Sequence, residues 1–548
     1  MTSYDVIFLH PPSFVEYGRK PWFPGPIART VSTFSPLFIM IPIGVLSLCE
    51  SLVENGFSAK IVNLGEQMLD SPTFKLESRI KDLDPRIFAI DLHWDVHSHG
   101  AIKTAEICKQ QHPNSFVLLG GLTASYFSRE IVSSFDFVDG VISGEAEDAI
   151  IALADRVTKS RGLGDVPNLT YRESNGRVMI NPQAKPSMSI DDYSFTSLNL
   201  VEPRERLLSV DLGPRRVKVW NVPVCRGCTF NCVTCGGSEY AYRKMLMRDK
   251  PAFRSPSRIV DDFQRLDEQG IDRIFLFQDC RIGTRSYYEG LLKTLHKEKW
   301  SNIEHVSLEL FSPVDDEFTR YLASNKPADN IGLLISPESG CDEVRNAHGR
   351  KYDNEAILST VDRCEANSIP IDFHFMIGLG HESFESLDRT WVLWDKILSR
   401  KTQDFFTCVD LGLMVLLDPG SIAYDNPAGC GYKMLYNTLS EMQHRLSGPS
   451  WVEWINYETL HMTRHDLVKS IFKAIETLTQ LHEKYGIIDR TKAHNEMMRL
   501  KLERAIVREV QDIVRIPDEK LRSQRLKELD QIYQDPLLSY SYVLTSEE

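Results

Sequence analysis

The sequence predicts an α/β protein built from two successive α/β units and a helical region at its end. Short apolar runs of strand length alternate with amphipathic stretches of helix length over residues 1–155, and the alternation returns over residues 217–420. Residues 156–216 interrupt it, and over residues 421–548 the 3.6-residue periodicity of helices dominates. A chain of 548 residues is also too long for a single hydrophobic core. We therefore expect these four segments to be the domains and linker of the protein.

Composition excludes several classes of protein. With 42% hydrophobic and 25% charged residues, the chain has the make-up of a globular protein rather than a disordered one. Its net charge of −13 argues against a general surface for nucleic acid or anionic membrane, because both need a basic footprint. The first 30 residues lack a signal-peptide pattern, and the apolar run "PLFIMIPIGVLSLC" is too short to span a bilayer. We expect a cytoplasmic protein that binds neither nucleic acid nor membrane.

The first unit has the pattern of a parallel sheet with helices on both faces, a Rossmann-like arrangement. Strands are expected at "YDVIFLH", "SAKIVNL", "RIFAIDLHW", "SFVLLGG" and "FVDGVISGEAED", and helices at "IGVLSLCESLVENG" and "GAIKTAEICKQQHP". Ligands of such sheets bind beyond the carboxyl ends of the strands. The informative loops therefore follow Leu9, Trp94, Leu119 and Ser143.

Two of these loops carry glycines at a strand end. Gly120 and Gly121, followed by Thr123, close the fourth expected strand, and Gly144 with Glu145 closes the fifth. A backbone without side chains lets a bulky ligand approach a strand end closely. Short glycine motifs are weak signals, and a tight turn that begins a helix is the alternative for either loop.

Residues 156–216 have the pattern of a connector. The stretch "VPNLTYRESNGRVMINP" contains two alternating runs joined at Asn175-Gly176, which is a strong two-residue hairpin signal. The following "KPSMSIDDYSFTSLNL" has the pattern of an irregular crossover. We expect a linker with a β-hairpin and no chemistry of its own.

The second unit begins with the strand "RVKVWNV" and contains about six strand–helix pairs, too few for an eight-fold barrel. A Gly/Pro-rich loop, "LDPGSIAYDNPAGCGYKM", is expected over the mouth of this unit. The long helical stretches beyond it are expected to form a cap that shields the site from water. The cluster of Trp451, Trp454 and Tyr457 favours core or interdomain packing over a substrate platform.

Four cysteines lie within eleven positions directly after the first strand of the second unit, in "VCRGCTFNCVTC". The odd total of 11 cysteines, with no export signal, favours reduced thiols that serve a metal. One reading is a tetrathiolate site that includes Cys225, but structural zinc sites normally separate their cysteine pairs by about a dozen residues or more. The spacing of Cys228, Cys232 and Cys235 favours an iron–sulfur cubane whose fourth iron is open.

This cysteine loop resembles the cluster motif of radical S-adenosylmethionine (SAM) enzymes, with Cys225 in a Ser/Thr position. The resemblance implies a [4Fe-4S] cluster on Cys228, Cys232 and Cys235 within a partial (β/α)6 barrel, and SAM bound to the open iron. An electron, delivered by an external reductant of the flavodoxin or ferredoxin type, would cleave SAM to a 5′-deoxyadenosyl radical. We expect Cys225 to be a small buried side chain; a fourth ligand or a redox role is the alternative.

The same resemblance implies SAM contacts at the carboxyl ends of the barrel strands. "MIGLGHES" is similar to the adenine-side turn "MIGLPGET" of the family, but Gly380 and His381 replace Pro and Gly, so we expect a looser turn. For Glu309 and Arg350 the alternative is a surface salt bridge. The expected SAM-binding residues are Gly236, Gly237, Glu309, Ser336, Glu338, Arg350 and Gly378.

Ahead of such a barrel, the strand order and glycine loops of the first unit resemble the cobalamin-binding domain joined to many radical SAM enzymes. "DLHWDVHSHG" also spells Asp95-x-His97-x-x-Gly100, the motif through which a histidine ligates cobalt in some cobalamin proteins. Here the motif follows the third strand instead of the first, and histidines that cap the next helix are the alternative. The expected cobalamin-binding residues are Trp94, His97, Gly120, Gly121, Thr123, Gly144 and Glu145.

These resemblances imply, as the first hypothesis, a cobalamin-dependent radical SAM C-methyltransferase that methylates an unactivated carbon through methylcobalamin and a 5′-deoxyadenosyl radical. One rival keeps the cofactors but forms a ring, rearranges the substrate or transfers the methyl group in a polar step. Another is a metal–thiolate binding or sensor module, for which "LHPPSFVEYG" lacks the GxGxxG turn. No residue identifies the substrate or a catalytic side chain. The candidates are a protein or peptide side chain, a natural-product intermediate and a lipid, and we favour the peptide or protein.

Overall fold

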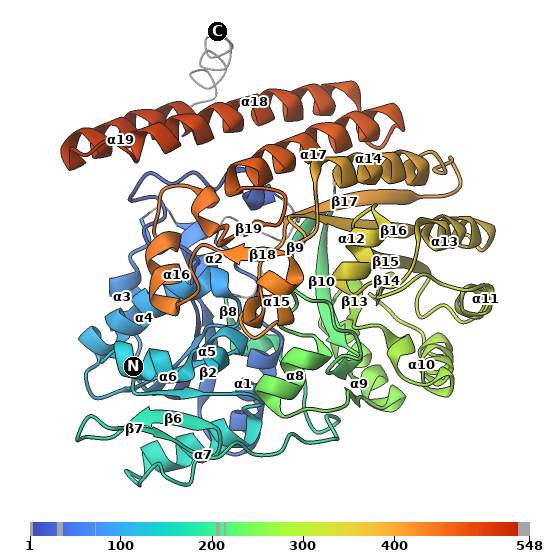
Figure 1. Ribbon diagram of the computed structural model, residues 1–548. Coiled ribbons are helices and arrows are strands. Elements are labelled where there is room, and N and C mark those ends of the chain that lie inside the picture. Colours follow the sequence, from blue (N-terminus) through green and yellow to red (C-terminus); the bar gives the residue numbers. More distant parts are fainter. Residues whose placement is uncertain (1–3, 30–36, 72, 204–208, 213–214, 535–548) are drawn as a thin grey trace.

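The structure is a computed structural model of the 548-residue chain, and it describes residues 4–29, 37–71, 73–203, 209–212 and 215–534. Two separate sheets organise it (Figure 1). Helices cover both sheets, and the residues after the second sheet run back across the first (Figure 1). Among the described residues, no helix is long and apolar enough to cross a membrane.

The first sheet has eight strands in the order β7-β6-β5-β4-β3-β1-β2-β8. Five strands from β5 to β2 run parallel, β8 joins β2 in parallel, and β6 and β7 add antiparallel strands at the other edge. The strands are β1 Tyr4–His10, β2 Ala59–Asn63, β3 Pro85–Asp91, β4 Phe116–Gly120, β5 Gly140–Ile142, β6 Leu169–Arg172, β7 Val178–Ile180 and β8 Val201–Glu202. The helices are α1 Gly44–Glu54, α2 Leu64–Asp70, α3 Leu76–Lys81, α4 Ser98–Gln111, α5 Leu122–Tyr126, α6 Ser128–Ser134 and α7 Glu147–Thr158, with 3-10 turns η1 Gly25–Arg29, η2 Asp95–His97 and η3 Leu198–Leu200.

The hairpin expected at Asn175-Gly176 is the turn between β6 and β7. Gly176 has a positive φ of 85°, which a residue without a side chain adopts at little cost. The hairpin extends one edge of the first sheet, and β8 extends the other. The segment that follows the first α/β unit therefore belongs to its sheet and also contributes Ile190 and Phe195 to the cavity described below.

The second sheet has the order β17-β16-β15-β14-β13-β10-β9, in which the strands from β10 to β17 are parallel and β9 is antiparallel. Its strands are β9 Ser209–Leu212, β10 Arg215–Pro223, β13 Arg273–Phe277, β14 His305–Leu310, β15 Asn330–Glu338, β16 Ile371–Ile377 and β17 Thr407–Met414. The helices are α8 Glu239–Leu246, α9 Pro256–Glu268, α10 Arg285–Lys297, α11 Asp316–Ser324, α12 Asp342–His348, α13 Asn354–Ala366 and α14 Phe384–Leu398, and the short β11 Cys225–Arg226 pairs with β12 Ala252–Phe253. This arrangement of parallel strands and helices confirms the predicted partial (β/α)6 barrel.

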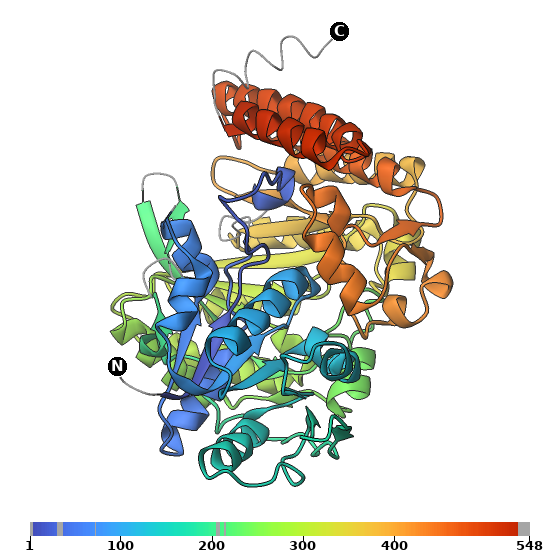
Figure 2. The same cartoon turned by 90° about the vertical axis from the view of Figure 1, so that its left-hand side faces the viewer.

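The last 130 residues contain a β-ladder as well as the predicted helices. The elements are α15 Ile422–Asp425, β18 Tyr432–Met434, α16 Leu439–Leu446, β19 Tyr457–Thr459, α17 Arg464–Lys484, α18 Arg490–Ile513 and α19 Glu519–Gln534, with 3-10 turns η5 Ala428–Cys430 and η6 Trp451–Trp454. Figures 1 and 2 agree that α18 and α19 lie at the opposite end of the molecule from the β6–β7 hairpin. Since α17 packs on α14 and β17, the long helices cover the outer edge of the barrel, and the cover over its mouth comes from the shorter elements before them.

The aromatic cluster of this region packs in the core, as predicted. Trp451 and Tyr457 are fully buried, at 0% and 1% exposure. The ring of Trp454 lies 6.0 Å from that of Trp22 and 5.3 Å from that of Phe38, both of which belong to the first unit. These contacts join the C-terminal region to the segment that follows β1.

The start of α4 packs closely on the turn after β1. A Cβ atom added at Gly100 would lie 1.6 Å from the carbonyl oxygen of Pro12, which no side chain can tolerate without a backbone shift. The glycine that ends the Asp95-x-His97-x-x-Gly100 motif is therefore required for packing.

We expect Gly100→Ala to lower the free energy of unfolding by about 2 kcal/mol or more, because it overpacks a backbone contact. The matched control is Gly290→Ala in α10, where the new methyl group meets no atom within 4 Å. That change should stabilise the protein by about 0.5–1 kcal/mol through helix propensity. Thermal denaturation of both variants is the measurement; equal melting temperatures would contradict the packing argument.

Candidate active site

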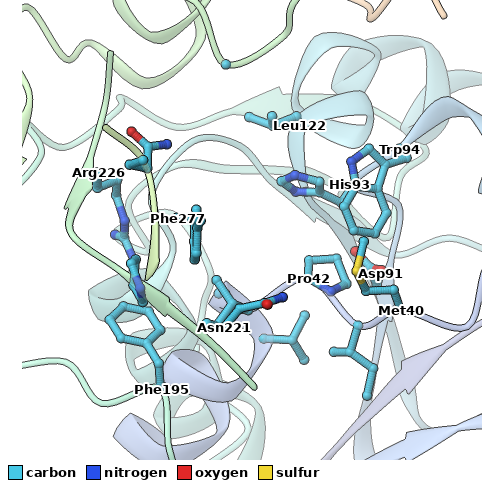
Figure 3. A pocket seen from close by; sticks show the side chains of 18 of the residues that line it. Met40, Pro42, Asp91, His93, Trp94, Leu122, Phe195, Asn221, Arg226 and Phe277 are labelled. Carbon is cyan, nitrogen blue, oxygen red and sulfur yellow. The ribbon is translucent and has the colours of Figure 1, made fainter. Parts of the chain in front are cut away.

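One large cavity, which we call the shared cavity, lies between the carboxyl edge of the first sheet and the interior of the second (Figure 3). Its volume is about 1300 Å³. Asp91 faces it from the end of β3, and His93 and Trp94 face it from the loop that follows (Figure 3). Asn221 and Phe277 face it from the barrel (Figure 3). The strand ends that the sequence singled out in the two units therefore meet around a single space.

The cysteine loop lies at the barrel side of this cavity. The backbone N–H of Phe230 donates to Cys228 Sγ at 3.3 Å, and that of Gly237 donates to Cys235 Sγ at 3.2 Å. Burial raises the pKa of Cys232 to about 11, opposed by the charge of Arg350, so a bound metal would be needed to hold this sulfur as a thiolate at neutral pH. Cys235 has accessible surface because it lines the shared cavity.

No three His, Cys, Asp or Glu side chains within the described ranges converge as the ligands of one metal ion must. A cubane does not require such convergence, because each of its cysteines binds a different iron. The fourth cysteine of the loop, Cys225, is 2% exposed, and its thiol donates to Gln278 Oε1 at 3.4 Å. It has the environment of the small buried side chain that we expected, although it also touches the cavity.

Of the residues expected to bind SAM, Glu309, Ser336 and Gly237 line the shared cavity. Glu309 is held at the end of β14, where its carboxylate accepts the backbone N–H of Gln278 at 2.7 Å. Burial raises the pKa of Glu309, so the surface salt bridge considered for it is excluded. Its side chain and that of Ser336 point into the barrel because they alternate with buried apolar residues along their strands.

Glu338 and Arg350 lie beside the cysteine loop, outside the set of cavity-lining residues. Glu338 Oε1 is 3.7 Å from Arg350 Nη2, and both side chains are 9% exposed, which excludes the surface pairing considered for Arg350. Burial raises the pKa of Glu338 to about 7. The guanidinium of Arg350 stacks on Phe230 and Phe311 and lowers the pKa of Cys232 through its charge. Arg350 therefore supports the loop that carries the three cysteines.

Gly236 contacts a residue that sequence reasoning missed. Its backbone N–H donates to Asp418 Oδ2 at 2.8 Å, and Asp418 lines the shared cavity. Burial raises the pKa of Asp418 to about 6. The only local signal was an Asp-Pro-Gly turn shortly after the last barrel strand, in a loop expected to lie over the mouth.

The turn after β16 is tight, not loose as expected. A Cβ atom at Gly380 would lie 1.9 Å from the carbonyl oxygen of Cys430, and one at Gly378 would lie 2.3 Å from Tyr457 Oη. The backbone N–H of Gly378 donates to Glu382 at 2.8 Å. The β18–β19 ladder covers this turn, so glycine at position 380 serves close packing; Gly378 is not among the cavity-lining residues.

Three residues at and just after the end of β4 line the shared cavity, and their local contacts differ: Gly120, Gly121 and Thr123. The nearest atom to a Cβ placed at Gly120 is 3.9 Å away, so this position faces open space. A Cβ at Gly121 would lie 2.6 Å from the backbone of His93, and its φ of 110° favours glycine. Thr123 Oγ1 donates to the carbonyl of His93 at 2.9 Å. Gly121 and Thr123 thus hold the loop after β3.

In that loop, His93 and Trp94 face the cavity, whereas His97 does not line it. His97 is fully buried, and its Nε2 is 3.0 Å from the carbonyl oxygen of Phe38. His99 pairs with Glu16 at 2.8 Å. These contacts join His97 and His99 to the segment after β1, and His97, at the N-terminus of α4, makes no side-chain cap hydrogen bond, so the helix-capping alternative is wrong. His93 faces the cavity, and the sequence analysis left it out of the candidate site.

Gly144 and Glu145 lie where the first sheet meets the barrel. Glu145 pairs with Arg226 at 3.1 Å and with Arg248 at 2.6 Å, and Arg226 also pairs with Glu147 at 2.6 Å. Burial raises the pKa of Glu147, but the charge of Arg226 outweighs that effect and holds this pKa below its usual range. Glu145 lines the cavity, but its carboxylate is engaged by two guanidinium groups, so its direct task is to join the two units.

The two units match two families. Residues 30–154 match the B12 binding domain, and residues 222–390 match the radical SAM superfamily. The chain therefore combines a B12-binding domain with a radical SAM domain that follows it.

Proteins similar to this chain include a methyltransferase, a cyclase and a protein whose solved structure has the same fold. An uncharacterized methyltransferase of Pyrococcus horikoshii is 26% identical over 66% of this chain and 74% of its own length. An anaerobic magnesium-protoporphyrin IX monomethyl ester cyclase of Rubrivivax gelatinosus is 22% identical over 53% of this chain, which spans about half (51%) of the cyclase. The structure of the radical SAM methyltransferase TsrM from Kitasatospora setae, with cobalamin and a [4Fe-4S] cluster bound, has a TM-score of 0.57 at 13% identity and covers 97% of this chain and 100% of TsrM.

We expect Ala at Cys228, Cys232 or Cys235 to abolish iron and sulfide binding, because each sulfur would bind a separate iron. The matched control is Cys225→Ala in the same loop, which should keep both, since Cys225 is hydrogen bonded to Gln278. Iron and sulfide analysis after anaerobic reconstitution is the measurement. Loss of the cluster in Cys225→Ala would refute the three-cysteine assignment.

Proposed function

We propose that this protein is a cobalamin-dependent radical SAM C-methyltransferase that methylates an unactivated carbon. The observation that carries the proposal is the shared cavity, because its walls come from the strand ends of the B12-binding sheet and from the cysteine loop of the barrel. A methyl donor and a hydrogen-abstracting radical must both reach one substrate carbon. A single space bounded by both units meets that requirement.

The chain's residues fit the three cofactors. Three thiols with backbone N–H groups directed at two of them suit a [4Fe-4S] cluster. Open space above Gly120 and the cavity-facing side chains of His93 and Trp94 suit cobalamin. When bound, the cofactors supply methyl transfer from cobalt and a carbon-centred radical from SAM. We assign SAM to the barrel end lined by Gly237, Glu309 and Ser336, with Glu338 and Arg350 supporting the cysteine loop.

The protein's own contribution is position and exclusion of water. The Glu145–Arg226–Glu147 pairing holds the B12-binding sheet against the cysteine loop. Asp418 and Pro419, from the loop after β17, line the cavity and cover its mouth, and Asp418 accepts the N–H of Gly236. Exclusion of bulk water protects a reactive radical from unwanted hydrogen donors.

Methyl transfer is favoured over ring formation. The Pyrococcus methyltransferase aligns over 74% of its length and the cyclase over 51%. The TsrM fold spans nearly the whole of this chain. An external one-electron donor of the flavodoxin or ferredoxin type is required for the cluster. The charged residues among those that line the cavity, which include Arg216, Arg273 and Glu309, favour a peptide-like substrate over a lipid.

The test of this function is a product count on the reconstituted protein with cobalamin, SAM, a strong reductant and a small-molecule cell extract as the source of substrate. We expect S-adenosylhomocysteine and 5′-deoxyadenosine together, both dependent on bound cobalamin. The control is Cys232→Ala, which should form neither 5′-deoxyadenosine nor a methylated product. Only 5′-deoxyadenosine would point to a non-methylating enzyme, and only S-adenosylhomocysteine would point to polar methyl transfer.

The cobalamin site is tested at Gly120. Gly120→Leu should lower cobalamin retention at least tenfold, because the side chain enters the open space over the strand end without striking the backbone. Leu at Gly121 would be less informative, since it collides with His93. The control is Gly162→Leu, at a glycine of the same unit with no atom within 4 Å. Cobalamin and iron content are measured together; unchanged cobalamin in Gly120→Leu would refute the assignment.

A further inference from the structure

The interior of this partial barrel carries polar side chains, whereas the interior of a complete eight-fold barrel is usually filled by branched aliphatic ones. Along β13, β14 and β16 the residues alternate between buried apolar ones, which face the helices, and partly accessible ones, which face inward. The inward positions near the starts of these strands are Arg273, His305, Ser307, Asp372 and His374. Arg273, His305, Ser307 and His374 line the shared cavity. We call these residues, with Arg216 and Asp410, the polar floor.

One side of the polar floor is basic and lacks counter-charges. Arg216 on β10 and Arg273 on β13 both line the cavity, and neither side chain has a hydrogen bond or ion pair to any residue that the structure describes. Arg273 Nε is buried without a partner. Burial, with the charge of Arg273, lowers the pKa of His305 to about 4. His305 is therefore uncharged at pH 7 and adds no charge to this side of the polar floor. Two unpaired guanidinium groups in a cavity are suited to an acid group of a ligand.

The other side of the polar floor is acidic. His374 Nε2 lies 3.7 Å from Asp410 Oδ2, and the two residues are cross-strand neighbours on β16 and β17. Asp372 shares a face of β16 with His374, and its Oδ1 is buried without a partner among the described residues. Burial, with nearby Asp410, raises the pKa of Asp372 to about 7. An ammonium group placed here would supply the missing donor and restore the charge of the carboxylate.

The sheet order sets these two groups against each other. β10 and β13 lie toward one edge of the second sheet, and β16 and β17 lie at the other. Because the sheet curves into a partial barrel, we infer that the inward side chains of β13 and β16 face one another across the interior; Arg273 and His374 line the same cavity. His305 lies four residues before Glu309 on β14, so the polar floor is about 13 Å from the end assigned to SAM.

We propose that the polar floor binds the charged ends of a small zwitterionic substrate, its acid group at Arg216 and Arg273 and its amino group at Asp372, His374 and Asp410. This inference rests on the proposed function, since it names the substrate class of that site. The carbon to be methylated then lies toward Glu309 and the cysteine loop. A lipid would leave Arg273 Nε and Asp372 Oδ1, which are both buried, without hydrogen-bond partners, and that costs free energy.

The experiment measures the binding of simple probes to the full chain loaded with cluster and cobalamin. The zwitterionic probes are glycine, 4-aminobutanoate and 6-aminohexanoate, and the comparison probes are hexanoate, hexylamine and hexan-1-ol. We expect the best zwitterion to bind at least tenfold more tightly than any comparison probe. Equal or tighter binding of a comparison probe would overturn the proposal.

Substitutions in the polar floor test which residues bind the acid group of the probe and which bind its amino group. Arg273→Gln should weaken the best zwitterion at least tenfold and leave hexylamine unchanged, and Arg216→Gln, at an exposed position where folding is not at risk, should act in the same direction. Asp372→Asn should weaken the zwitterion and leave hexanoate unchanged. The matched control is Arg215→Gln: this neighbour is 58% exposed and pairs outside the barrel with Glu304 at 2.8 Å, so probe binding should not change.

Unchanged binding in both Arg216→Gln and Arg273→Gln would also overturn the assignment. Probe binding needs neither SAM nor turnover, so its outcome is separate from the product count. Failure of the zwitterion preference in a protein that forms both S-adenosylhomocysteine and 5′-deoxyadenosine would refute the substrate class alone. A zwitterion preference in a protein that forms neither would refute methyl transfer alone.

Discussion

The ion-pair network between Arg226, Arg248, Glu145 and Glu147 is the contact on which the site depends. The glutamates follow β5 of the B12-binding sheet, and Arg226 stands within the cysteine loop. The four charges balance, and removal of any one would leave an uncompensated buried charge, which typically costs about 3–5 kcal/mol. Because the network joins a strand end of one unit to the cluster loop of the other, it sets the distance and orientation between them. The shared cavity exists only in that arrangement.

Within this frame, the protein tolerates polar groups that an ordinary core would exclude. Arg273 Nε, Asp372 Oδ1 and Glu338 Oε2 are buried without hydrogen-bond partners among the described residues. Such groups normally cost free energy, and they persist where a ligand completes them. Their positions divide into two sets, one beside the cysteine loop and one at the floor of the barrel. We assign the first set to the cofactors and the second to the substrate, and the inferred substrate class rests on that assignment.

Several features were predictable because they depend on residues close together in the sequence. The Asn175-Gly176 turn, the alternation of strands and helices, and the cysteine spacing are local patterns, and each has a short-range physical cause. Other local motifs led to wrong expectations, because their residues serve packing between distant segments and not the function that the motif indicates. Gly100 and His97 match a ligation motif, yet one meets Pro12 and the other the carbonyl of Phe38. Gly380 suggested a loose turn, yet it is packed against Cys430 from a segment 50 residues away in the chain.

By itself the sequence determined the two α/β units, the helical end and the loop of three cysteines, because hydrophobic periodicity and thiol spacing act over a few residues. Only the tertiary structure decided which strand-end residues share a cavity. In the tertiary structure His93 lines the cavity and His97 does not. Glu145 forms an ion pair with Arg226, and Asp418 accepts a hydrogen bond from Gly236, which is 182 residues away in the sequence. The tertiary structure also brought Arg273 and His374, from different strands, to one cavity. Such pairings depend on how two sheets dock and curve, and packing between distant segments, which leaves no periodic trace in the sequence, controls that geometry.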